Sequence, residues 1–259
     1  MAGWRQRGPL WTLEPDRVHG RPNGVVEFIG GTGLAATPQF SYRRLLEAMA
    51  ARGWEVRAWS FVPSFDHQAQ ANEAWRGFRA ARQEPFAEEA LGSLPVLRLG
   101  HSLGCKLHLL APDGGRGSAG LVALSFNNFS AGRSIPLLTE IGQQFGFRSE
   151  FSPSPQETLR QVSDSYRPPR NLLVRFRRDE LDQSRRLLSV LQERPDDATT
   201  LLELPGDHLT PASAGLRRNL LGDWADDPAR QRQIERLAGA VLAWAVAAPA
   251  ARAQTATPD

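Results

Sequence analysis

The sequence predicts an α/β fold with a mostly parallel central sheet, helices on both faces and a small lid insertion. Three observations support this prediction. Short apolar runs alternate with segments of helical periodicity, which is the pattern of right-handed strand–helix–strand crossovers. The chain has 259 residues, 41% of them hydrophobic, so one sizeable core can form. One excursion, residues 127–168, is too long for an ordinary connection and therefore predicts the lid.

Six short apolar runs are expected to form the strands of the sheet. The run that starts at Trp54 alternates apolar and polar residues in the way a strand does. The six runs are residues 25–30, 54–61, 95–100, 119–126, 171–176 and 199–205.

The first helix is expected between Thr37 and Gly53. Thr37 is a suitable N-cap, Pro38 suits the first turn, and Gly53 suits the end of the helix. Apolar residues recur at helical spacing within this segment and predict one buried stripe. The residues of the stripe are Tyr42, Leu45, Leu46 and Met49.

Helices are also expected between the later strands. Asp66 is a suitable N-cap for a helix over residues 66–81. The other helical segments are residues 103–110, 155–163 and 184–194, and a final helix that contains Ile234, Leu237, Val241 and Trp244. Together these elements predict a single domain over residues 1–248, followed by a flexible C-terminal tail, residues 249–259.

The charge distribution does not indicate a nucleic-acid-binding protein. The formal net charge is only +3, and the high pI of about 9.7 reflects the near absence of lysine: Lys106 is the only one among 31 basic residues. Pairs of arginines are scattered and interleaved with acidic residues, whereas nucleic-acid binding needs arginines clustered on one face. We therefore expect no nucleic-acid partner.

The cysteine content and the apolar segments point to the cytoplasm. Cys105 is the only cysteine, so an intrachain disulfide and a cysteine-based zinc site are both excluded. The five histidines show no spacing typical of metal ligands, and we expect neither a metal nor another cofactor. No apolar segment suits a signal peptide or a membrane-spanning helix, although peripheral membrane contact stays open.

The segment from Pro95 to Leu110 places a Gly-His-Ser-Leu-Gly motif between a predicted strand and a predicted helix. Gly-x-Ser-x-Gly is weak evidence as a string. A nucleophilic serine occupies a tight, strained turn where a strand directly precedes the motif and a helix directly follows it. We therefore interpret Ser102 as a candidate nucleophile. The alternative is that Ser102 is a helix N-cap between incidental glycines.

A nucleophilic serine needs a base, and the base needs an acid that orients it. His208 follows the strand 199–205 and is the only histidine after residue 108. Asp179 is the first carboxylate after the strand 171–176; Asp182 is the alternative acid, although it is also placed to cap a helix beside Ser184. For a working triad, Ser102 Oγ and His208 are expected about 2.6–3.5 Å apart, allowing for the looser geometry of a ligand-free site.

Acyl transfer also requires hydrogen-bond donors for the oxyanion. The backbone N–H of Leu103, directly after Ser102, is the first candidate. The second is expected in the glycine-rich loop after the strand 25–30, at Gly31 or Thr32. The alternatives for this loop are a flexible turn or a phosphate-binding loop, but the known nucleotide-binding glycine patterns are absent from it.

The motif and several longer strings resemble a known family. The motif itself is that of the α/β-hydrolase superfamily. The strings GHSLGCKLHLL, SFNN, RFRRDELDQS, FIGG and PQFSYRRLLEAMAARGW resemble one branch of it, the uncharacterised cyanobacterial and chloroplast family called domain of unknown function 1350. The resemblance covers about residues 11–211. It implies an α/β-hydrolase fold and a cyanobacterial-type cytoplasmic protein, and it implies no particular substrate.

Four further polar residues are candidates for the pocket. His67 follows a predicted strand and is placed to face the site, although Asp66 beside it serves equally well as a simple helix cap. Asn127 and Asn128 follow the strand 119–126 and are candidates to contact a substrate carbonyl or to form a polar turn. His101, next to Ser102, is the fourth candidate.

Taken together, the residues predict a serine hydrolase that acts on a small-molecule acyl ester or thioester through Ser102, His208 and Asp179. The predicted lid is rich in phenylalanine and leucine, which favours an apolar acyl group. The alternative is a non-catalytic binding or scaffold protein with the same fold, because fold alone does not establish function. The sequence leaves the oligomeric state open.

Overall fold

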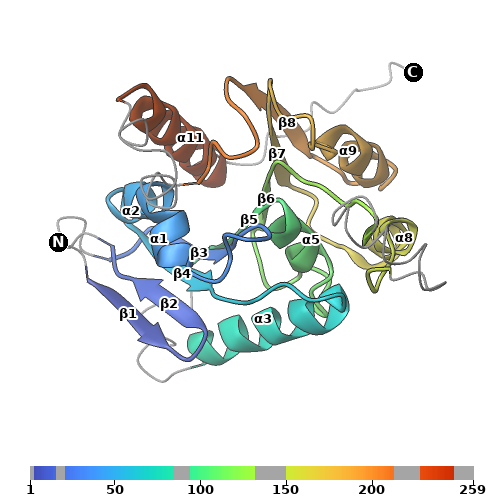
Figure 1. Cartoon of the computed structure of the whole chain (residues 1–259), viewed down its shortest axis with the longest axis horizontal. Helices are drawn as coiled ribbons and strands as arrows, with labels where there is room; N and C mark the ends of the chain where they lie inside the picture. The colour runs from blue at the N-terminus through green and yellow to red at the C-terminus, as the bar shows by residue number, and fades with distance from the viewer. Residues whose placement is uncertain (1–2, 16–20, 84–93, 132–149, 213–227, 248–259) are drawn as a thin grey trace, which may run out of the picture.

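The computed structural model describes the chain except for residues 1–2, 16–20, 84–93, 132–149, 213–227 and 248–259 (Figure 1). The described residues form an eight-stranded sheet in the order β1-β2-β4-β3-β5-β6-β7-β8. The strands are β1 (Trp4–Arg7), β2 (Leu10–Leu13), β3 (Gly24–Ile29), β4 (Trp54–Trp59), β5 (Val96–His101), β6 (Gly120–Leu124), β7 (Asn171–Phe176) and β8 (Thr200–Leu204). From β4 to β8 every neighbouring pair is parallel, which confirms the predicted mostly parallel sheet.

The six predicted strands are all present, but the sequence analysis missed β1 and β2. These two strands form an antiparallel hairpin, and β2 pairs antiparallel with β4 at the edge of the sheet. The turn contains Gly8 at a φ of 57°, a conformation that favours glycine. Each strand has only four residues and β1 is largely exposed. Their pattern is therefore too short and too polar to stand out in the sequence.

Helices cover both faces of the sheet, as predicted (Figure 1). One face is covered by α2 and α11, whose buried residues belong to the same apolar cluster as those of the central strands. The other face is covered by α3, α5, α8 and α9, through two further clusters. The helices are α1 (Pro38–Ser41), α2 (Arg43–Ala50), α3 (His67–Arg82), α5 (Leu103–Leu109), α8 (Pro155–Ser165), α9 (Ser184–Gln192) and α11 (Pro228–Val246).

The predicted helix 37–53 is divided into α1 and α2 at Tyr42. Tyr42 has non-helical backbone angles, φ −123° and ψ 16°, and its side chain is fully buried, as are the other three residues of the predicted stripe. The prediction that Thr37 caps the helix is wrong. The Thr37 side chain makes no capping hydrogen bond, because its hydroxyl faces Ser41 at 3.4 Å instead.

The structure describes the predicted Asp66 cap and part of the predicted lid segment. Asp66 caps α3, accepting from the Ala69 N–H at 2.8 Å. Within the predicted lid, α8 starts with a capping box and packs Leu159 and Val162 into the core, so this part of the segment covers the sheet. The middle of the predicted lid, residues 132–149, and the predicted tail both lie outside the described residues.

Buried charges on the central strands are neutralised in pairs. Glu27 of β3 accepts two hydrogen bonds of 2.7 Å from Arg82 at the end of α3. Arg98 of β5 donates two hydrogen bonds, of 2.9 and 2.7 Å, to Asp113. A buried charge is tolerated only when it is paired and hydrogen-bonded. These pairs tie the sheet to the helical layer that contains α3 and α5.

The strand order creates a crevice at the carboxyl ends of β3 and β5. From β3 the chain first moves to β4 on one side, then returns to β5 on the other side of β3. Such a switch point separates the loops that follow the two strands, and ligands of open α/β sheets bind there. The loops after β3 and β5 carry Gly31, Thr32 and Ser102.

Gly104 allows α5 to pass directly over the end of β3. A Cβ atom at this position would overlap the carbonyl of Ile29 and lie 2.9 Å from the carbonyl oxygen of Gly30. Because both obstacles are backbone atoms, neither can move aside cheaply. The second glycine of the motif is therefore required by packing.

We predict that Gly104→Ala lowers the free energy of unfolding by at least about 2 kcal/mol, because the added methyl group overpacks this contact. Gly239→Ala in α11 is the matched control, since nothing lies within 4 Å of its added Cβ. It should leave stability unchanged or raise it by up to about 1 kcal/mol. Urea denaturation of both variants measures the difference, and equal effects would refute the packing argument.

Candidate active site

Ser102 lies directly after β5, at the N-cap of α5, with φ 54° and ψ −117°. A non-glycine residue in this region carries strain of about 1–3 kcal/mol, which must be balanced by surrounding contacts. The Ser102 N–H donates to the carbonyl of Leu124 on β6 at 2.9 Å. Ser102 therefore sits on the strained strand-to-helix turn that the motif predicts.

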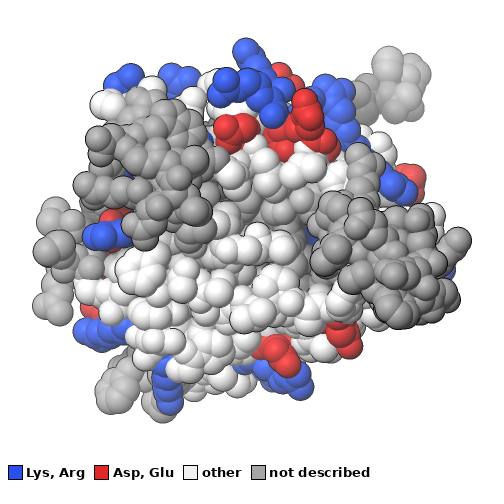
Figure 2. All heavy atoms as spheres, viewed as in Figure 1, with Lys and Arg blue, Asp and Glu red and all other residues white. Residues whose placement is uncertain are grey.

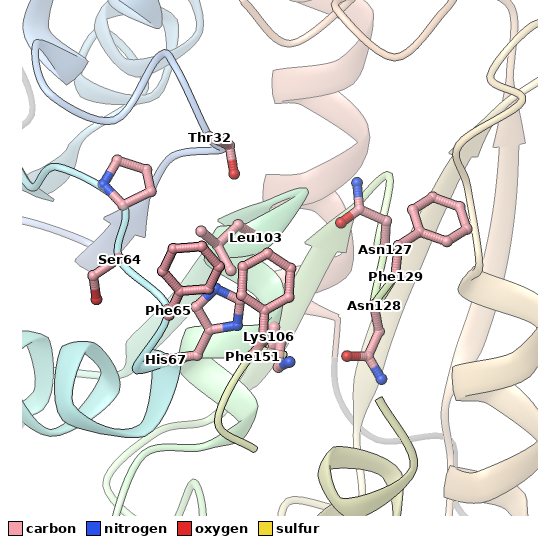
Figure 3. Close-up of a pocket in the computed structure, with 11 residues that line it drawn as sticks. Thr32, Ser64, Phe65, His67, Leu103, Lys106, Asn127, Asn128, Phe129 and Phe151 are labelled. Carbon is pink, nitrogen blue, oxygen red and sulfur yellow. The ribbon is translucent and has the colours of Figure 1, made fainter. Parts of the chain in front are cut away.

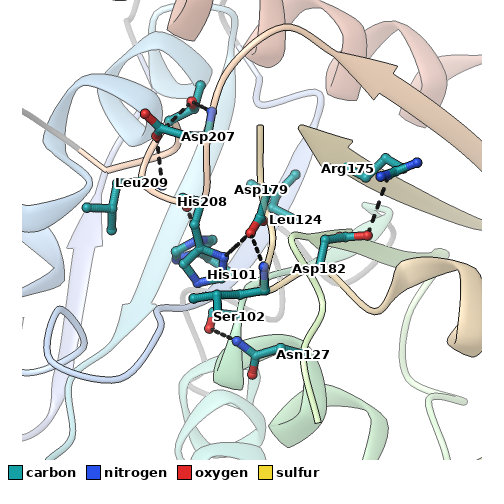
Figure 4. Close-up of polar contacts among 12 residues, drawn as sticks. His101, Ser102, Leu124, Asn127, Arg175, Asp179, Asp182, Asp207, His208 and Leu209 are labelled. Atoms are coloured by element: carbon teal, nitrogen blue, oxygen red, sulfur yellow. Dashed lines mark hydrogen bonds and ion pairs between the residues drawn. The ribbon is translucent and has the colours of Figure 1, made fainter. Parts of the chain in front are cut away.

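Asp179 and His208 form a close pair beside this turn (Figure 4). They lie on the loops after β7 and β8, as the sequence analysis expected. His208 Nδ1 lies 2.9 Å from Asp179 Oδ2 and 3.1 Å from Oδ1. The carboxylate is fully buried, and the imidazole is 19% exposed.

The environment of Asp179 keeps it ionised. Burial raises its pKa, but the hydrogen bonds from His208 and from the Leu181 N–H favour the ionised form, and the pKa lies below its usual value. An ionised carboxylate only accepts hydrogen bonds, so His208 carries a proton on Nδ1. In the neutral imidazole this leaves Nε2 unprotonated, which is the state required of a general base.

The expected hydrogen bond between Ser102 and His208 is not formed among the described side chains. The Ser102 hydroxyl instead accepts from Asn127 Nδ2 at 2.8 Å and points away from His208 (Figure 4). Asn127 follows β6, the neighbour of β5 in the sheet, and this neighbourhood brings its amide to Ser102. The hydroxyl can adopt another orientation only by changing its χ1 rotamer.

The alternative acid, Asp182, has a different set of contacts. It accepts from the N–H and the hydroxyl of Ser184, at 3.1 and 2.7 Å, at the start of α9. Arg175 Nε lies 3.7 Å from it. Burial raises the pKa of Asp182. Asp179, and not Asp182, is therefore the carboxylate that contacts His208.

A buried chain of hydrogen bonds connects the loop after β3 to the loop that carries His208. The Gly31 N–H donates to Tyr42 Oη at 2.8 Å, and Tyr42 Oη lies 2.7 Å from His101 Nδ1. His101 Nε2 lies 2.8 Å from the carbonyl oxygen of His208. Burial, followed by the charge of His208, lowers the pKa of His101 to about 3, so this imidazole is neutral.

The direction of each hydrogen bond in this chain follows from its ends. A carbonyl oxygen only accepts, so His101 Nε2 carries the proton that is donated to His208. His101 Nδ1 is then an acceptor, and Tyr42 donates its hydroxyl proton to it. The Tyr42 oxygen in turn accepts from the Gly31 N–H. Every polar atom in the chain thus has a partner of the correct type.

This chain of hydrogen bonds changes two expectations about the site. The N–H of Gly31 is already bonded to Tyr42, so Gly31 is not available as an oxyanion donor. A glycine is still needed here, because a Cβ atom would lie 2.9 Å from Ser102 Cβ. His101, expected at the pocket, is instead 1% exposed and is not among the lining residues.

A pocket with a volume of about 140 Å³ opens beside Leu103, the residue that follows Ser102 (Figure 3). Five of the residues expected at the site line it: Thr32, His67, Leu103, Asn127 and Asn128. Its other lining residues are Pro63, Ser64, Phe65, Lys106, Phe129 and Phe151. The two candidate backbone donors and the candidate pocket residues other than His101 are therefore brought together.

His67 and Lys106 are the two ionisable residues in the lining of this pocket. The His67 ring stacks on Phe151 with 4.2 Å between ring centroids. Burial, followed by the charge of Lys106, lowers the pKa of His67 to about 3, so the imidazole is neutral. Lys106 Nζ donates to the carbonyl of Pro153 at 3.0 Å.

The sequence analysis missed Tyr42 and Lys106 as residues of the site. Tyr42 was assigned to the core by its helical spacing, which reports burial but not the partner of its hydroxyl. Lys106 carried one signal, since it is the only lysine of the chain. Cys105 beside it is fully buried in the core, as expected of a small apolar residue.

The described residues contain no cluster of three or more histidine, cysteine, aspartate or glutamate residues placed to hold a metal ion. Among the described helices, none combines the length and the apolar character that crossing a membrane requires. On the face seen in Figure 2, the described basic and acidic side chains are interspersed around the edge.

We predict that Tyr42→Phe lowers the free energy of unfolding by about 2 kcal/mol or more. The change leaves the Gly31 N–H without an acceptor and His101 Nδ1 without a donor, and each buried unpaired group costs about 1–3 kcal/mol. Tyr166→Phe is the matched control, because Tyr166 is also buried but its hydroxyl bonds only Asn171, which has a second donor in the Leu121 N–H. Equal losses in chemical denaturation would contradict the connected chain.

Comparisons with known proteins agree with the fold of this site. A sugar hydrolase from Lactococcus lactis is similar with a TM-score of 0.61 and 14% identity, over 94% of this chain and 98% of that one. An esterase domain from Rhodothermus marinus has a TM-score of 0.58 and 15% identity, over 95% of this chain and 97% of that one. An α/β serine hydrolase without a lid from Xanthomonas campestris has a TM-score of 0.54 and 14% identity, over 96% of each chain. At these identities the likeness shows the α/β-hydrolase fold.

Sequence comparison gives the family. No curated protein matches the chain in sequence. The model of the family described as "Protein of unknown function (DUF1350)" matches residues 3–244, which is most of the chain. The chain therefore belongs to the DUF1350 family, and its fold is that of the α/β-hydrolases.

Proposed function

We propose that this protein is a serine hydrolase that cleaves a small-molecule acyl ester or thioester. The observation that carries the proposal is the buried Asp179–His208 pair, at 2.9 Å, beside a serine on a strained strand-to-helix turn. The three residues occur in the chain order Ser, Asp, His, each after a strand of the same parallel sheet. This order and placement are typical of α/β-hydrolase triads.

In the proposed reaction, the Ser102 hydroxyl leaves Asn127 and turns towards His208. Its oxygen attacks the acyl carbonyl while His208 Nε2 takes the proton, and Asp179 stabilises the resulting imidazolium. The tetrahedral intermediate collapses, and His208 returns the proton to the departing alcohol or thiol. A water molecule, activated by His208 in the same way, then releases the acid and restores the Ser102 hydroxyl.

The oxyanion is held by the backbone N–H groups of Leu103 and Thr32. Both residues line the pocket, and no described residue accepts a hydrogen bond from either N–H. Asn127 supplies a further donor, because its amide already lies within 2.8 Å of Ser102 Oγ. A single well-placed donor of this kind contributes about 2.7–4 kcal/mol to transition-state stabilisation.

The pocket supports an acyl substrate with apolar parts. Phe65, Phe129 and Phe151 line it, together with Leu103, which follows Ser102 in the chain, and Asn127, which bonds the Ser102 hydroxyl (Figure 3). Aromatic walls bind apolar groups by excluding water from both surfaces. The fold shared with solved hydrolases supports the same reaction class.

One observation favours a second candidate function, a non-catalytic binding protein with this fold. Ser102 Oγ is bound to Asn127 and not to His208. In a binding protein this arrangement would be permanent, and the pocket would hold its ligand without cleaving it. The two candidates differ in whether Ser102 reacts as a nucleophile.

We predict that a fluorophosphonate probe labels the wild-type protein covalently, because it traps a serine that an adjacent base activates. Ser102→Ala should abolish labelling, whereas Ser189→Ala removes an exposed serine of α9 whose hydroxyl donates to the Arg185 carbonyl, and this variant should still be labelled. Mass spectrometry of the labelled peptide identifies the site. If the wild type remains unlabelled while a known serine hydrolase reacts under the same conditions, the non-catalytic function is favoured.

We predict that Asp179→Asn lowers kcat by about 10²–10⁴-fold, because an amide neither fixes the His208 tautomer nor stabilises the imidazolium. Asp182→Asn is the matched control: it changes a neighbouring buried carboxylate that bonds Ser184 and does not contact His208. Its kcat should change less than about threefold. Steady-state kinetics on 4-nitrophenyl esters compares the two, and similar losses would argue against Asp179 as the orienting acid.

A further inference from the structure

Lys106 is a buried cation beside the proposed nucleophile. It follows Ser102 by one turn of α5, and it is 1% exposed. Its Nζ donates to the Pro153 carbonyl at 3.0 Å and lies 5.8 Å from the centroid of the Phe151 ring. No described carboxylate forms an ion pair with it, so two of its three ammonium protons lack an acceptor among the described residues.

The lining of the pocket does not neutralise this charge. None of its eleven residues is acidic, and His67, the other ionisable one, is neutral. The buried charges on the sheet show the contrast, since Glu27 and Arg98 each have a bidentate partner. A buried charge without a partner is costly. Glu150 and Glu157 act on Lys106 through their charges, but no described carboxylate forms an ion pair with it.

Further polar atoms in the lining of the pocket also lack hydrogen-bond partners among the described residues. His67 Nδ1 and Asn128 Oδ1 are buried and have no hydrogen-bond partner among the described residues. His67 and Asn128 are themselves only 4% and 5% exposed. Figure 3 places both residues and Lys106 around the same pocket. A purely hydrocarbon ligand would leave all of these polar groups desolvated and unpaired.

We propose that the pocket binds an acyl group whose far end carries a carboxylate, which pairs with Lys106. The inference rests on the proposed hydrolase function, because the acyl carbonyl must lie at Ser102 for the acyl chain to extend towards Lys106. The aromatic side chains hold the methylene groups between the two ends. The substrates are then monoesters or monothioesters of dicarboxylic acids, and the far carboxylate is unchanged by the reaction.

Matched ester pairs test this proposal by turnover. The mono-4-nitrophenyl esters of adipic, pimelic and suberic acids are compared with the hexanoate, heptanoate and octanoate esters, in which a methyl group replaces the carboxylate. The leaving group is identical, and the uncatalysed rate of each ester is subtracted. We expect kcat/KM to be at least about tenfold higher for the best carboxylated ester than for its neutral counterpart, as expected for a hydrogen bond to a charged group.

Variants of Lys106 separate charge from structure. Lys106→Met should lower kcat/KM at least about tenfold for the carboxylated esters and less than about threefold for the neutral ones. Lys106→Gln can still donate to the Pro153 carbonyl and should give the same selective loss. Arg79→Met, which removes an exposed positive charge elsewhere, should change neither class. An equal loss on both ester classes would make Lys106 a structural residue and overturn the proposal.

The wild-type protein alone gives an independent readout through pH. Burial lowers the pKa of Lys106 to about 8, and the charges of Glu150 and Glu157 offset this only in part. Among the described residues, His67 is the other ionisable group that interacts with Lys106, and its pKa of about 3 keeps it neutral throughout the pH range near 8. The lysine is a cation below its pKa, so the preference for carboxylated esters should fall as the pH rises through about 8. The ratio to the neutral ester cancels the titration of the triad.

Binding distinguishes failure of this inference from failure of the proposed function. In the Ser102→Ala background, calorimetry should show that the adipic, pimelic or suberic monoester binds at least about tenfold more tightly than its neutral counterpart. Adding Lys106→Gln should remove this difference. Selective binding without turnover by the wild type would support the carboxylate site and refute the hydrolase. Turnover with no preference for the carboxylate, in rate or in binding, would support the hydrolase and refute the carboxylate site.

Discussion

A buried chain of hydrogen bonds runs from the Gly31 N–H through Tyr42 and His101 to the carbonyl of His208. It joins the loop after β3, the break between α1 and α2, the end of β5 and the loop after β8. These segments are far apart in the sequence, and each carries or adjoins a group of the candidate site. Because unpaired polar groups are costly in the interior, the four segments hold one another in a single arrangement.

The strain at Ser102 depends on the same arrangement. A positive φ persists only where surrounding contacts over-determine it. Here the Ser102 N–H is bonded to β6, Gly31 packs against its Cβ, and Gly104 lets α5 pass over β3. His101, its neighbour in the chain, is fixed at both ring nitrogens. The backbone of the turn is thus held rigidly, while the Ser102 hydroxyl can still change its orientation by rotation about χ1.

Charge is treated differently in the sheet and in the pocket. On the central strands, the buried charges of Glu27 and Arg98 are each matched by a bidentate partner, as the interior of a protein requires. In the pocket, the ammonium group of Lys106 has only a neutral carbonyl as its acceptor among the described residues. The difference follows from location, because a group that borders a cavity can obtain its partner from a ligand. This contrast is what connects the pocket to a negatively charged acyl group.

The periodicity of the sequence was sufficient to predict the class of fold and six of the strands, because buried parallel strands and amphipathic helices leave strong local patterns. It did not reveal β1 and β2, which are short, polar and stabilised by pairing with β4. Domain boundaries and the lid stay predictions, since residues 132–149 lie outside the described part of the chain.

For the site, the sequence by itself determined the chain order and the strand-end positions of Ser102, Asp179 and His208. Only the tertiary structure decided that Asp179 rather than Asp182 contacts His208, and that the Gly31 N–H belongs to Tyr42. It also decided that the Ser102 hydroxyl faces Asn127. Hydrogen-bond partners and rotamers depend on which loops meet in space, and local periodicity carries no information about that.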